Sequence, residues 1–182
     1  VYKRQDFGNK NSLNLIKEFN PQICFHLAAQ SSVVVSVGDP LLDFEHNILQ
    51  PVQLIKTLLT TDCSKFVFTS SGGTIFGEPN ILPTSEEDFA GEPESPYGIG
   101  KKKLNEIITS MTIDTHMSYS ILNLSNVYGP RQDPHGEAGV VSIFSNKILN
   151  NEKPIIYGDG KQTRDYIYCL LYTSPSPRDT TA

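Results

Sequence analysis

One tyrosine and one lysine in this sequence stand at a spacing that could support acid–base chemistry. Tyr97 and Lys101 are four residues apart, so both side chains lie on one face if the segment is helical. An ammonium group beside a phenol favours the phenolate and lowers the pKa of the phenol toward neutrality. Such a phenolate is a usable general base for a hydroxyl group. Because the chain has eight tyrosines, the pattern is weak without support from its surroundings.

A pair of serines upstream supplies that support. Ser70 and Ser71 follow an apolar run at 65–69, and two glycines come next, which allow a ligand to approach the backbone closely. A serine hydroxyl at this place can hydrogen-bond a reacting oxygen and help to polarise the carbonyl formed from it. The alternative, that the serines merely end a strand, is the weaker one beside the tyrosine–lysine pair.

The elements that must position these groups alternate between short apolar strands and amphipathic helices. Asp39 and Pro40 are typical of a helix start, whereas Pro51 should bend or break the same helix. The alternation predicts an α/β fold, a doubly wound parallel sheet covered on both faces. We predict strands at 23–29, 65–69, 119–122 and 154–157, and helices at 13–19, 39–59, 97–111 and 140–149.

Small and polar residues stand where three of these strands end. They are the segments 28–30, 70–71 and 125–126. Ligands bind beyond the carboxyl ends of the strands in such sheets, so we predict one site there. A G-x-G-x-x-G turn, which would carry the pyrophosphate of a dinucleotide, is absent from the sequence. The piece is therefore expected to begin after that unit and to lack activity by itself.

Five stretches carry a resemblance to a known family: HLAAQ at 26–30, FTSSGG at 68–73, SPYGIGK at 95–101, SNVYGPR at 125–131 and GDGKQTRDY at 158–166. In order and spacing they resemble the extended short-chain dehydrogenase/reductase family, and its nucleotide-sugar epimerases in particular. The resemblance implies a Rossmann-like fold without its first βαβ unit, plus part of a small substrate-binding region. It also implies NAD as cofactor and epimerisation at C4 of a UDP-hexose (UDP-glucose/UDP-galactose) through a 4-keto intermediate.

The resemblance assigns roles by position. Asn126 would hold the diphosphate or sugar of the substrate, Tyr157 the uracil, and Arg164 the diphosphate, which suits its forked donors. The catalytic residues implied are Ser71, Tyr97 and Lys101. The cofactor-binding residues implied are Asp6, Phe7, Leu27, Ala28, Ala29, Gln30, Asn47, Thr69, Ser70, Tyr97, Lys101, Leu124 and Ser125. The substrate-binding residues implied are Ser71, Asn126, Val140, Tyr157 and Arg164.

Several rival functions share this scaffold. Epimerases of UDP-N-acetylglucosamine or UDP-glucuronate have the same motifs, and the sequence does not separate them. A sugar 4,6-dehydratase usually has an Asp-Glu pair after the strand-end hydroxyl, whereas this chain has Gly72 and Gly73. A non-catalytic dinucleotide-binding protein commonly loses the tyrosine or the lysine, and this chain keeps both. Asn123 stands where the family often has arginine, which weakens a structural ion pair.

Charge, apolar runs and the spacing of cysteines and histidines argue against several classes of protein. The formal net charge of -5 argues against a nucleic-acid partner, which requires a basic patch. Apolar runs such as 33–37 are far too short to cross a membrane. The three cysteines and four histidines have no metal-ligand spacing, so we expect no metal and a reduced, cytoplasmic setting. The resemblance implies a homodimer for the full-length parent.

Both ends of the sequence look foreign to the fold. Residues 1–5 can be encoded by DNA whose reverse complement, in another frame, encodes residues 169–173. Such inverted pairs resemble the transposon ends of sequencing libraries; the alternative is a genuine Ser/Pro-rich tail. We therefore predict that 1–5 and 169–182 are artefacts that pack poorly. A partial NAD-binding Rossmann domain would span 6–127 and a partial substrate-binding region 128–168.

Overall fold

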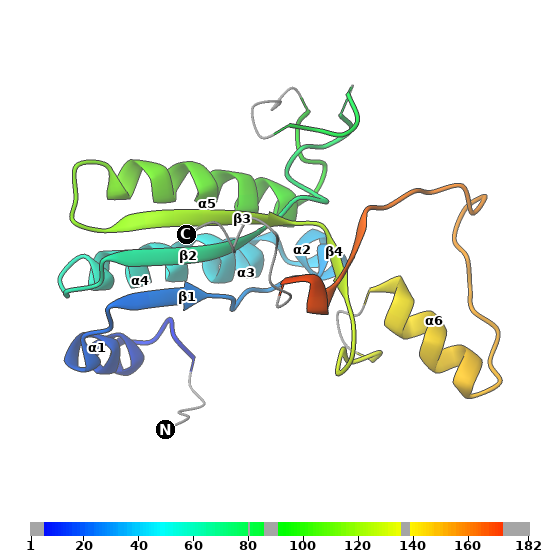
Figure 1. Ribbon diagram of the computed structural model, residues 1–182, viewed down its shortest axis with the longest axis horizontal. Helices are drawn as coiled ribbons and strands as arrows, with labels where there is room; N and C mark the ends of the chain where they lie inside the picture. Colours follow the sequence, from blue (N-terminus) through cyan, green and yellow to red (C-terminus); the bar gives the residue numbers. More distant parts are fainter. Residues whose placement is uncertain (1–5, 80, 86–90, 136–138, 173–182) are drawn as a thin grey trace, which may run out of the picture. The chain divides into compact units, whose positions relative to one another are not determined.

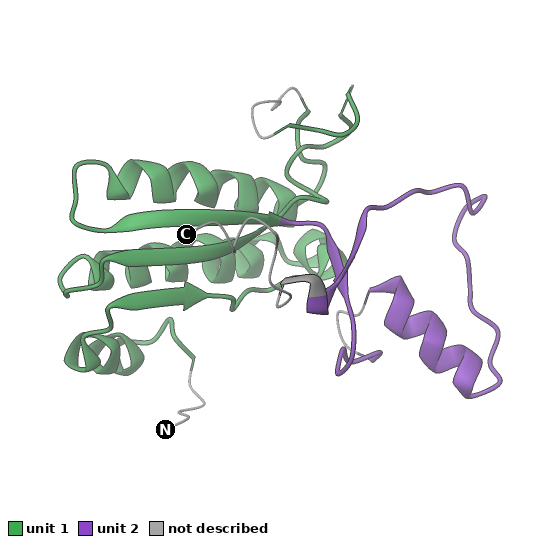
Figure 2. Cartoon of the chain, in the orientation of Figure 1, with its two compact units in different colours: residues 1–123 green, residues 124–182 purple. Residues whose placement is uncertain are grey.

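The chain forms two compact units, residues 1–123 and 124–182 (Figure 2). The computed structural model describes residues 6–79, 81–85, 91–135 and 139–172. The predicted poor packing of 1–5 and 173–182 lies outside the described residues.

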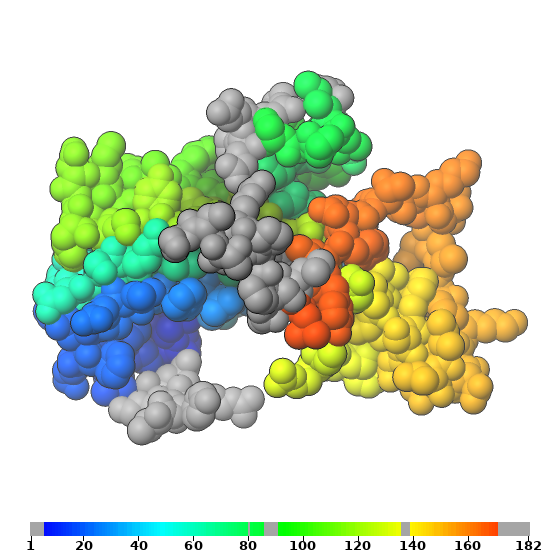
Figure 3. Space-filling view, in the orientation of Figure 1, coloured from blue at the N-terminus to red at the C-terminus, as the bar shows by residue number. Residues whose placement is uncertain are grey.

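A three-stranded sheet forms the centre of the first unit. Its strands are β1 (Ile23–His26), β2 (Lys65–Ser71) and β3 (Ser118–Leu124), in the order β1-β2-β3. β1 and β2 pair in parallel, and all three arrows point the same way in Figure 1. The same order appears as neighbouring blue, teal and green bands in Figure 3. The carboxyl ends of the strands therefore share one edge, where the sequence predicts the site.

Helices cover one face of this sheet. The core joins Phe66 and Phe68 of β2 to residues of α4 and α5, including Ile55, Leu58 and Leu104, which are at most 1% exposed. On the other face, Ile23 and Phe25 remain more than half exposed, at 52% and 64%. The helices are α1 (Lys10–Phe19), α2 (Val33–Gly38), α3 (Pro40–Phe44), α4 (Gln50–Leu58) and α5 (Pro96–Thr112).

The sequence predicts a bend or a break at Pro51, whereas helical structure continues from α3 to α4 and changes type before this proline. A π-helical segment, η1 (Glu45–Leu49), separates α3 from α4 directly before this proline. Proline has no backbone N–H, and its ring crowds the carbonyl four residues earlier, so regular α-helical hydrogen bonding cannot continue. π-Turns inside helices frequently occur at functional sites, and this one carries Asn47.

The second unit contains a small parallel sheet and one helix. β4 (Asn126–Tyr128) pairs with β5 (Tyr166–Tyr168), and α6 (Val140–Leu149) has the predicted bounds. A short 3-10 helix, η2 (Cys169–Tyr172), follows β5. Within the described residues, no helix of either unit is long and apolar enough to cross a membrane.

Some expected elements are wrong or missing. The strand predicted at 154–157 does not form, and Ile156 and Tyr157 are 63% and 80% exposed. Pro154 cannot donate a backbone hydrogen bond, and the segment pairs with no strand in the described part of the chain. β1 ends at His26 rather than at residue 29. The sequence analysis also missed α2, β4 and β5.

Candidate active site

Helix α5 presents Tyr97 and Lys101 toward the sheet. Ser95 caps the helix, because its side-chain oxygen accepts a hydrogen bond from the backbone N–H of Gly98 at 3.1 Å. Pro96 occupies the first turn, where its missing N–H costs nothing. Tyr97 and Lys101 follow one turn apart and are 8% and 3% exposed. The predicted shared helical face is therefore confirmed, and it is a buried one.

The Lys101 ammonium is held at the carboxyl end of β2. Its Nζ donates to the backbone oxygen of Thr69 at 3.1 Å and lies 4.6 Å from the ring centroid of Phe68. The Tyr97 ring centroid is 5.8 Å from the same atom, within cation–π range. Burial lowers the pKa of Lys101 to about 8, and the negative charge of Asp43 opposes that shift. Lys101 is thus placed to act on Tyr97 by charge.

The serine pair divides between the two faces of β2. Burial alternates along the strand, so Ser70 shares the core face of Phe66 and Phe68, whereas Ser71 points to the other face. The Ser70 hydroxyl is buried and has no hydrogen-bond partner among the described residues. Lys101 binds the carbonyl of Thr69, two residues before Ser71 on the same strand. The catalytic role of Ser71 stays a prediction.

The segment after β1 is anchored from the π-turn. Asn47 accepts a hydrogen bond from the backbone N–H of Gln30 at 3.1 Å and donates to its carbonyl at 2.8 Å. Ala28 and Ala29 directly precede Gln30, and both are small and exposed. Leu27 is exposed as well. A dinucleotide bound here would contact small exposed side chains at the end of β1. It would also find the Ser70 hydroxyl at the end of β2, which has no hydrogen-bond partner among the described residues. The residues present therefore fit the expected NAD.

Asp43 is a site residue that the sequence analysis missed. Its carboxylate is 1% exposed and accepts hydrogen bonds from the Gln30 side chain at 2.7 Å and the Asn47 side chain at 2.8 Å. Burial raises the pKa of Asp43, and both hydrogen bonds oppose the rise. Its four-residue spacing from Asn47 was the available signal, because that spacing places both on one helical face.

The N-terminal candidates Asp6 and Phe7 form a local turn. Asp6 Oδ1 accepts from the backbone N–H of Gly8 at 2.9 Å, and the Asp6 carbonyl accepts from the Ser12 hydroxyl at 2.6 Å. The Phe7 ring packs edge-on against His26, with centroids 5.0 Å apart. Their predicted contact with adenine stays a prediction.

Two of the candidates in the second unit, Asn126 and Arg164, lie at the start of its sheet. The Asn126 side chain donates to the carbonyl of Asp165 at 3.0 Å, so Asn126 lies beside the residue that follows Arg164. Arg164 is exposed and donates to the carbonyl of Thr163 at 2.7 Å. Tyr157 is 80% exposed and Val140 37% exposed. Leu124, the last residue of β3, and Ser125 stand where the second unit begins, and their predicted contact with the cofactor stays a prediction.

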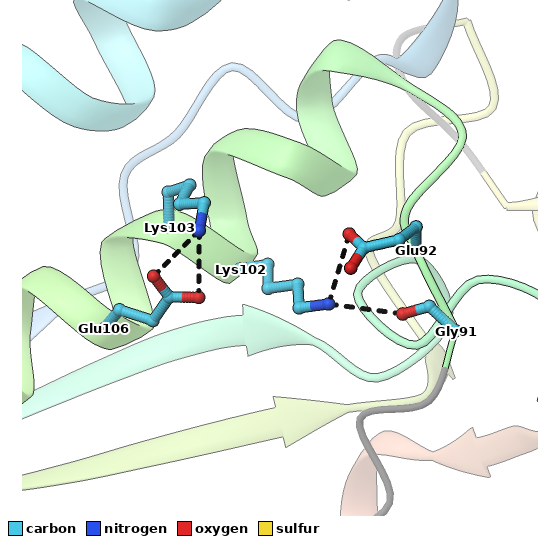
Figure 4. A network of polar contacts seen from close by, with 5 residues as sticks. All are labelled: Gly91, Glu92, Lys102, Lys103 and Glu106. Carbon is cyan, nitrogen blue, oxygen red and sulfur yellow. Dashed lines mark hydrogen bonds and ion pairs between the residues drawn. The ribbon is translucent and has the colours of Figure 1, made fainter.

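The two lysines that follow Lys101 form contacts away from the site. Lys102 donates to the carbonyl of Gly91 at 3.2 Å and to the Glu92 carboxylate at 3.4 Å, and so ties the loop before α5 to the helix (Figure 4). Lys103 pairs with Glu106 one turn further along, at 2.9 Å. Of these three consecutive lysines, Lys101 is the one that faces the end of β2.

Gly98 allows α5 to begin close to the loop after β2. A Cβ at this position would lie 2.9 Å from the backbone oxygen of Thr74 and 3.0 Å from Cβ of Pro93. Gly98→Ala should gain about 1 kcal/mol of helix propensity but lose roughly 1–3 kcal/mol to overpacking. We expect a net loss in the free energy of urea unfolding. Gly100→Ala is the matched control, because its nearest contact would be an ordinary 3.4 Å; equal stability of both variants would contradict the close approach.

Comparison with known proteins gives a consistent family assignment. The family model described as "NAD dependent epimerase/dehydratase family" matches residues 5–170. A putative UDP-glucose 4-epimerase of Methanocaldococcus jannaschii is 42% identical over 178 residues, which cover 88% of this chain and 58% of the relative.

Solved structures agree. The Thermotoga maritima UDP-glucose 4-epimerase, solved with UDP-glucose, has a TM-score of 0.86 and 39% identity, covering 90% of this chain and 53% of that one. A UDP-N-acetylglucosamine 4-epimerase of Methanobrevibacter ruminantium, in complex with UDP-N-acetylmuramic acid, has a TM-score of 0.82 and 34% identity, covering 90% and 52%. The chain thus spans about half the length of the proteins it matches.

Proposed function

Because this chain belongs to the NAD dependent epimerase/dehydratase family, we propose that the protein containing it inverts C4 of a UDP-hexose, interconverting UDP-glucose and UDP-galactose. The observation that carries the proposal is the buried Tyr97–Lys101 pair at the end of β2. A phenol beside a buried ammonium is suited to exchange a proton with a sugar hydroxyl. Fold neighbours named as UDP-glucose 4-epimerases support the choice of sugar.

The proposed mechanism gives each residue one task. Tyr97, as phenolate, takes the proton from the C4 hydroxyl while the Ser71 hydroxyl hydrogen-bonds the same oxygen. Lys101 stabilises the phenolate by its charge. Bound NAD supplies the acceptor, and later the donor, of the C4 hydride. Tyr97 returns its proton when the 4-keto sugar is reduced on the opposite face.

Inversion requires the sugar to turn over while its nucleotide stays bound. We propose that Asn126 and Arg164 hold the diphosphate and Tyr157 the uracil during this rotation. Asn126 and Arg164 lie close together in the second unit, since Asn126 binds the backbone of Asp165. We assign residues 6–127 to the cofactor domain and 128–168 to the substrate region. For the whole protein we propose a cytoplasmic homodimer; free Cys24 and Cys63 suit a reducing compartment.

An epimerase of UDP-N-acetylglucosamine is the second candidate, favoured by the fold neighbour of that name. Incubating the uninterrupted protein with UDP-glucose, UDP-galactose, UDP-N-acetylglucosamine and UDP-glucuronate separates the candidates by product analysis. We expect UDP-glucose and UDP-galactose to interconvert most efficiently. Loss of water to a 4-keto-6-deoxy sugar, or no turnover of any substrate with NAD bound, would overturn the proposal.

Arg164→Ala should weaken binding of UDP to the uninterrupted protein by about tenfold. The lost contact is a charge-assisted hydrogen bond to phosphate, remote from the reacting carbon. Because Arg164 is exposed, its removal leaves the packing of the unit intact. Calorimetry measures the affinity, with Lys161→Ala as the control, since Lys161 is a nearby exposed cation that pairs with Asp159. Equal affinities in both variants would contradict a diphosphate contact.

A further inference from the structure

A buried carboxylate lies directly beneath the helix that carries Tyr97 and Lys101. Asp43 is 1% exposed, and its Oδ2 is 3.4 Å from the point where a Cβ on Gly100 would lie. Asp43 therefore lies against the backbone of α5 one residue before Lys101. Contacts between α3 and α5 extend along this region.

The other oxygen of Asp43 organises the segment after β1. Asp43 Oδ1 accepts hydrogen bonds from both the Gln30 and the Asn47 side-chain amides, at 2.7 and 2.8 Å. Asn47 in turn holds both backbone groups of Gln30. A single carboxylate therefore joins three parts of the unit: the segment 28–30, the π-turn and helix α5.

Two opposite charges are buried in this region. Asp43 and Lys101 are 1% and 3% exposed, and a buried charge without a counter-charge is strongly unfavourable. The Lys101 ammonium is also faced by Tyr97 of α5, by Phe68 of β2 and by His26 of β1, whose positive form it disfavours. His46 of η1 faces Asp43 and acts to lower the pKa of that carboxyl. Among these groups Asp43 is the carboxylate, and its negative charge opposes the fall in the pKa of Lys101 caused by burial.

We propose that Asp43 is a positioning residue that serves as the buried counter-charge of Lys101 and fastens the segment 28–30 to the catalytic helix. This inference rests on the proposed function for the role of Lys101. Asp43 does not touch the reacting atoms; it keeps Lys101 charged, and Lys101 stabilises the phenolate of Tyr97. Through Gln30 it also holds the segment expected to lie along the cofactor.

Asp43→Asn separates the charge from the hydrogen bonds. An asparagine oxygen still accepts from Gln30 and Asn47, while the negative charge is lost. Glu45→Gln is the matched control, because it removes the same charge from an exposed position two residues away. Heteronuclear NMR of the Lys101 side chain in the 182-residue chain follows its titration without any substrate.

We expect the Lys101 midpoint, about 8 in the unaltered chain, to move lower in Asp43→Asn and to stay unchanged in Glu45→Gln. Amide signals of Gln30 and Asn47 should persist in both variants, which reports that the segment 28–30 is still held. An unchanged Lys101 midpoint in folded Asp43→Asn would overturn the inference.

A second measurement covers the case in which Asp43→Asn does not fold. In the unaltered chain, the Lys101 signals should follow the titration of the Asp43 carboxyl carbon, and Asp43 should be ionised at neutral pH. A protonated Asp43 at neutral pH would refute the role of Asp43 as counter-charge. So would Lys101 signals that do not change as the Asp43 carboxyl titrates. These outcomes are independent of the epimerase assay, so the proposed function and this inference can fail separately.

Discussion

Replacing Tyr97 by phenylalanine in the uninterrupted protein should lower turnover by about 10²–10⁴, the usual contribution of a positioned acid–base group. The substitution removes one hydroxyl from a ring that is 8% exposed, so its packing against the sheet is kept. Lys101 stays bound to the carbonyl of Thr69 and needs no new partner. We therefore expect the loss to appear in kcat, with NAD still bound and the free energy of unfolding little changed.

Tyr119→Phe is the matched control, because Tyr119 lies on β3 of the same unit and is 38% exposed. It loses the same hydroxyl group away from the site and should retain the activity of the unaltered protein. Initial rates of UDP-galactose formation at saturating substrate compare the two variants. Turnover of Tyr97→Phe equal to that of the control would remove Tyr97 from the mechanism.

Local signals explain why much of this fold was predictable. Helix α5 begins at Ser95-Pro96, and the predicted range 97–111 differs by one residue at each end from Pro96–Thr112. Strand β2 is an apolar run in a parallel sheet, and such a run is visible in the sequence. Pro51 marked the region of the irregular helix, although the sequence predicted a bend or break there and not the π-helical segment η1. The tyrosine–lysine pair was equally predictable, because its geometry depends only on a four-residue helical spacing.

Features that depend on distant partners were not predictable in this way. The apolar segment 154–157 has the composition of a strand, but a strand requires a neighbour. Conversely, β4 and β5 have three residues each and pair although residues 129–165 lie between them, in the register Asn126↔Tyr166 to Tyr128↔Tyr168. Helix α2 is rich in valine, a residue that favours strands. Its start is capped by the Ser32 side chain, which accepts a hydrogen bond from the backbone N–H of Val35. Asp43 was missed because its partners come from three separate segments.

Acid should destabilise this chain through His26. The ring is 4% exposed and stacks with Phe66 and Phe68, with centroids 6.0 and 5.8 Å away. Its Nε2 has no hydrogen-bond partner in the described part of the chain. Burial, and secondly the positive charge of Lys101, lower the pKa of His26 from 6.5 to about 4. The folded chain therefore holds His26 neutral at pH values where the unfolded chain protonates it.

The direction of the pH dependence follows from this difference. Between the unfolded pKa near 6.5 and the folded pKa near 4, the unfolded chain binds a proton that the folded chain does not, so stability falls as the pH falls. The contribution is complete above about pH 6.5 and fully lost below about pH 4, and it amounts to about 3 kcal/mol. Against a typical total of roughly 5–15 kcal/mol, such a loss can unfold a marginal domain.

Carboxylates also titrate over this range, so the effect of His26 is isolated by comparison with His26→Phe. Phenylalanine keeps an aromatic ring among Phe7, Phe66 and Phe68 but carries no proton. Urea unfolding at several pH values between about 4 and 7 should give the unaltered chain the steeper loss of stability below about pH 6.5, and a constant difference between the two variants above it. Curves that run parallel would show that His26 is protonated alike in both states. In that case a partner for Nε2 must compensate the burial of its charged form, because an imidazolium among three phenylalanines cannot be stable without one.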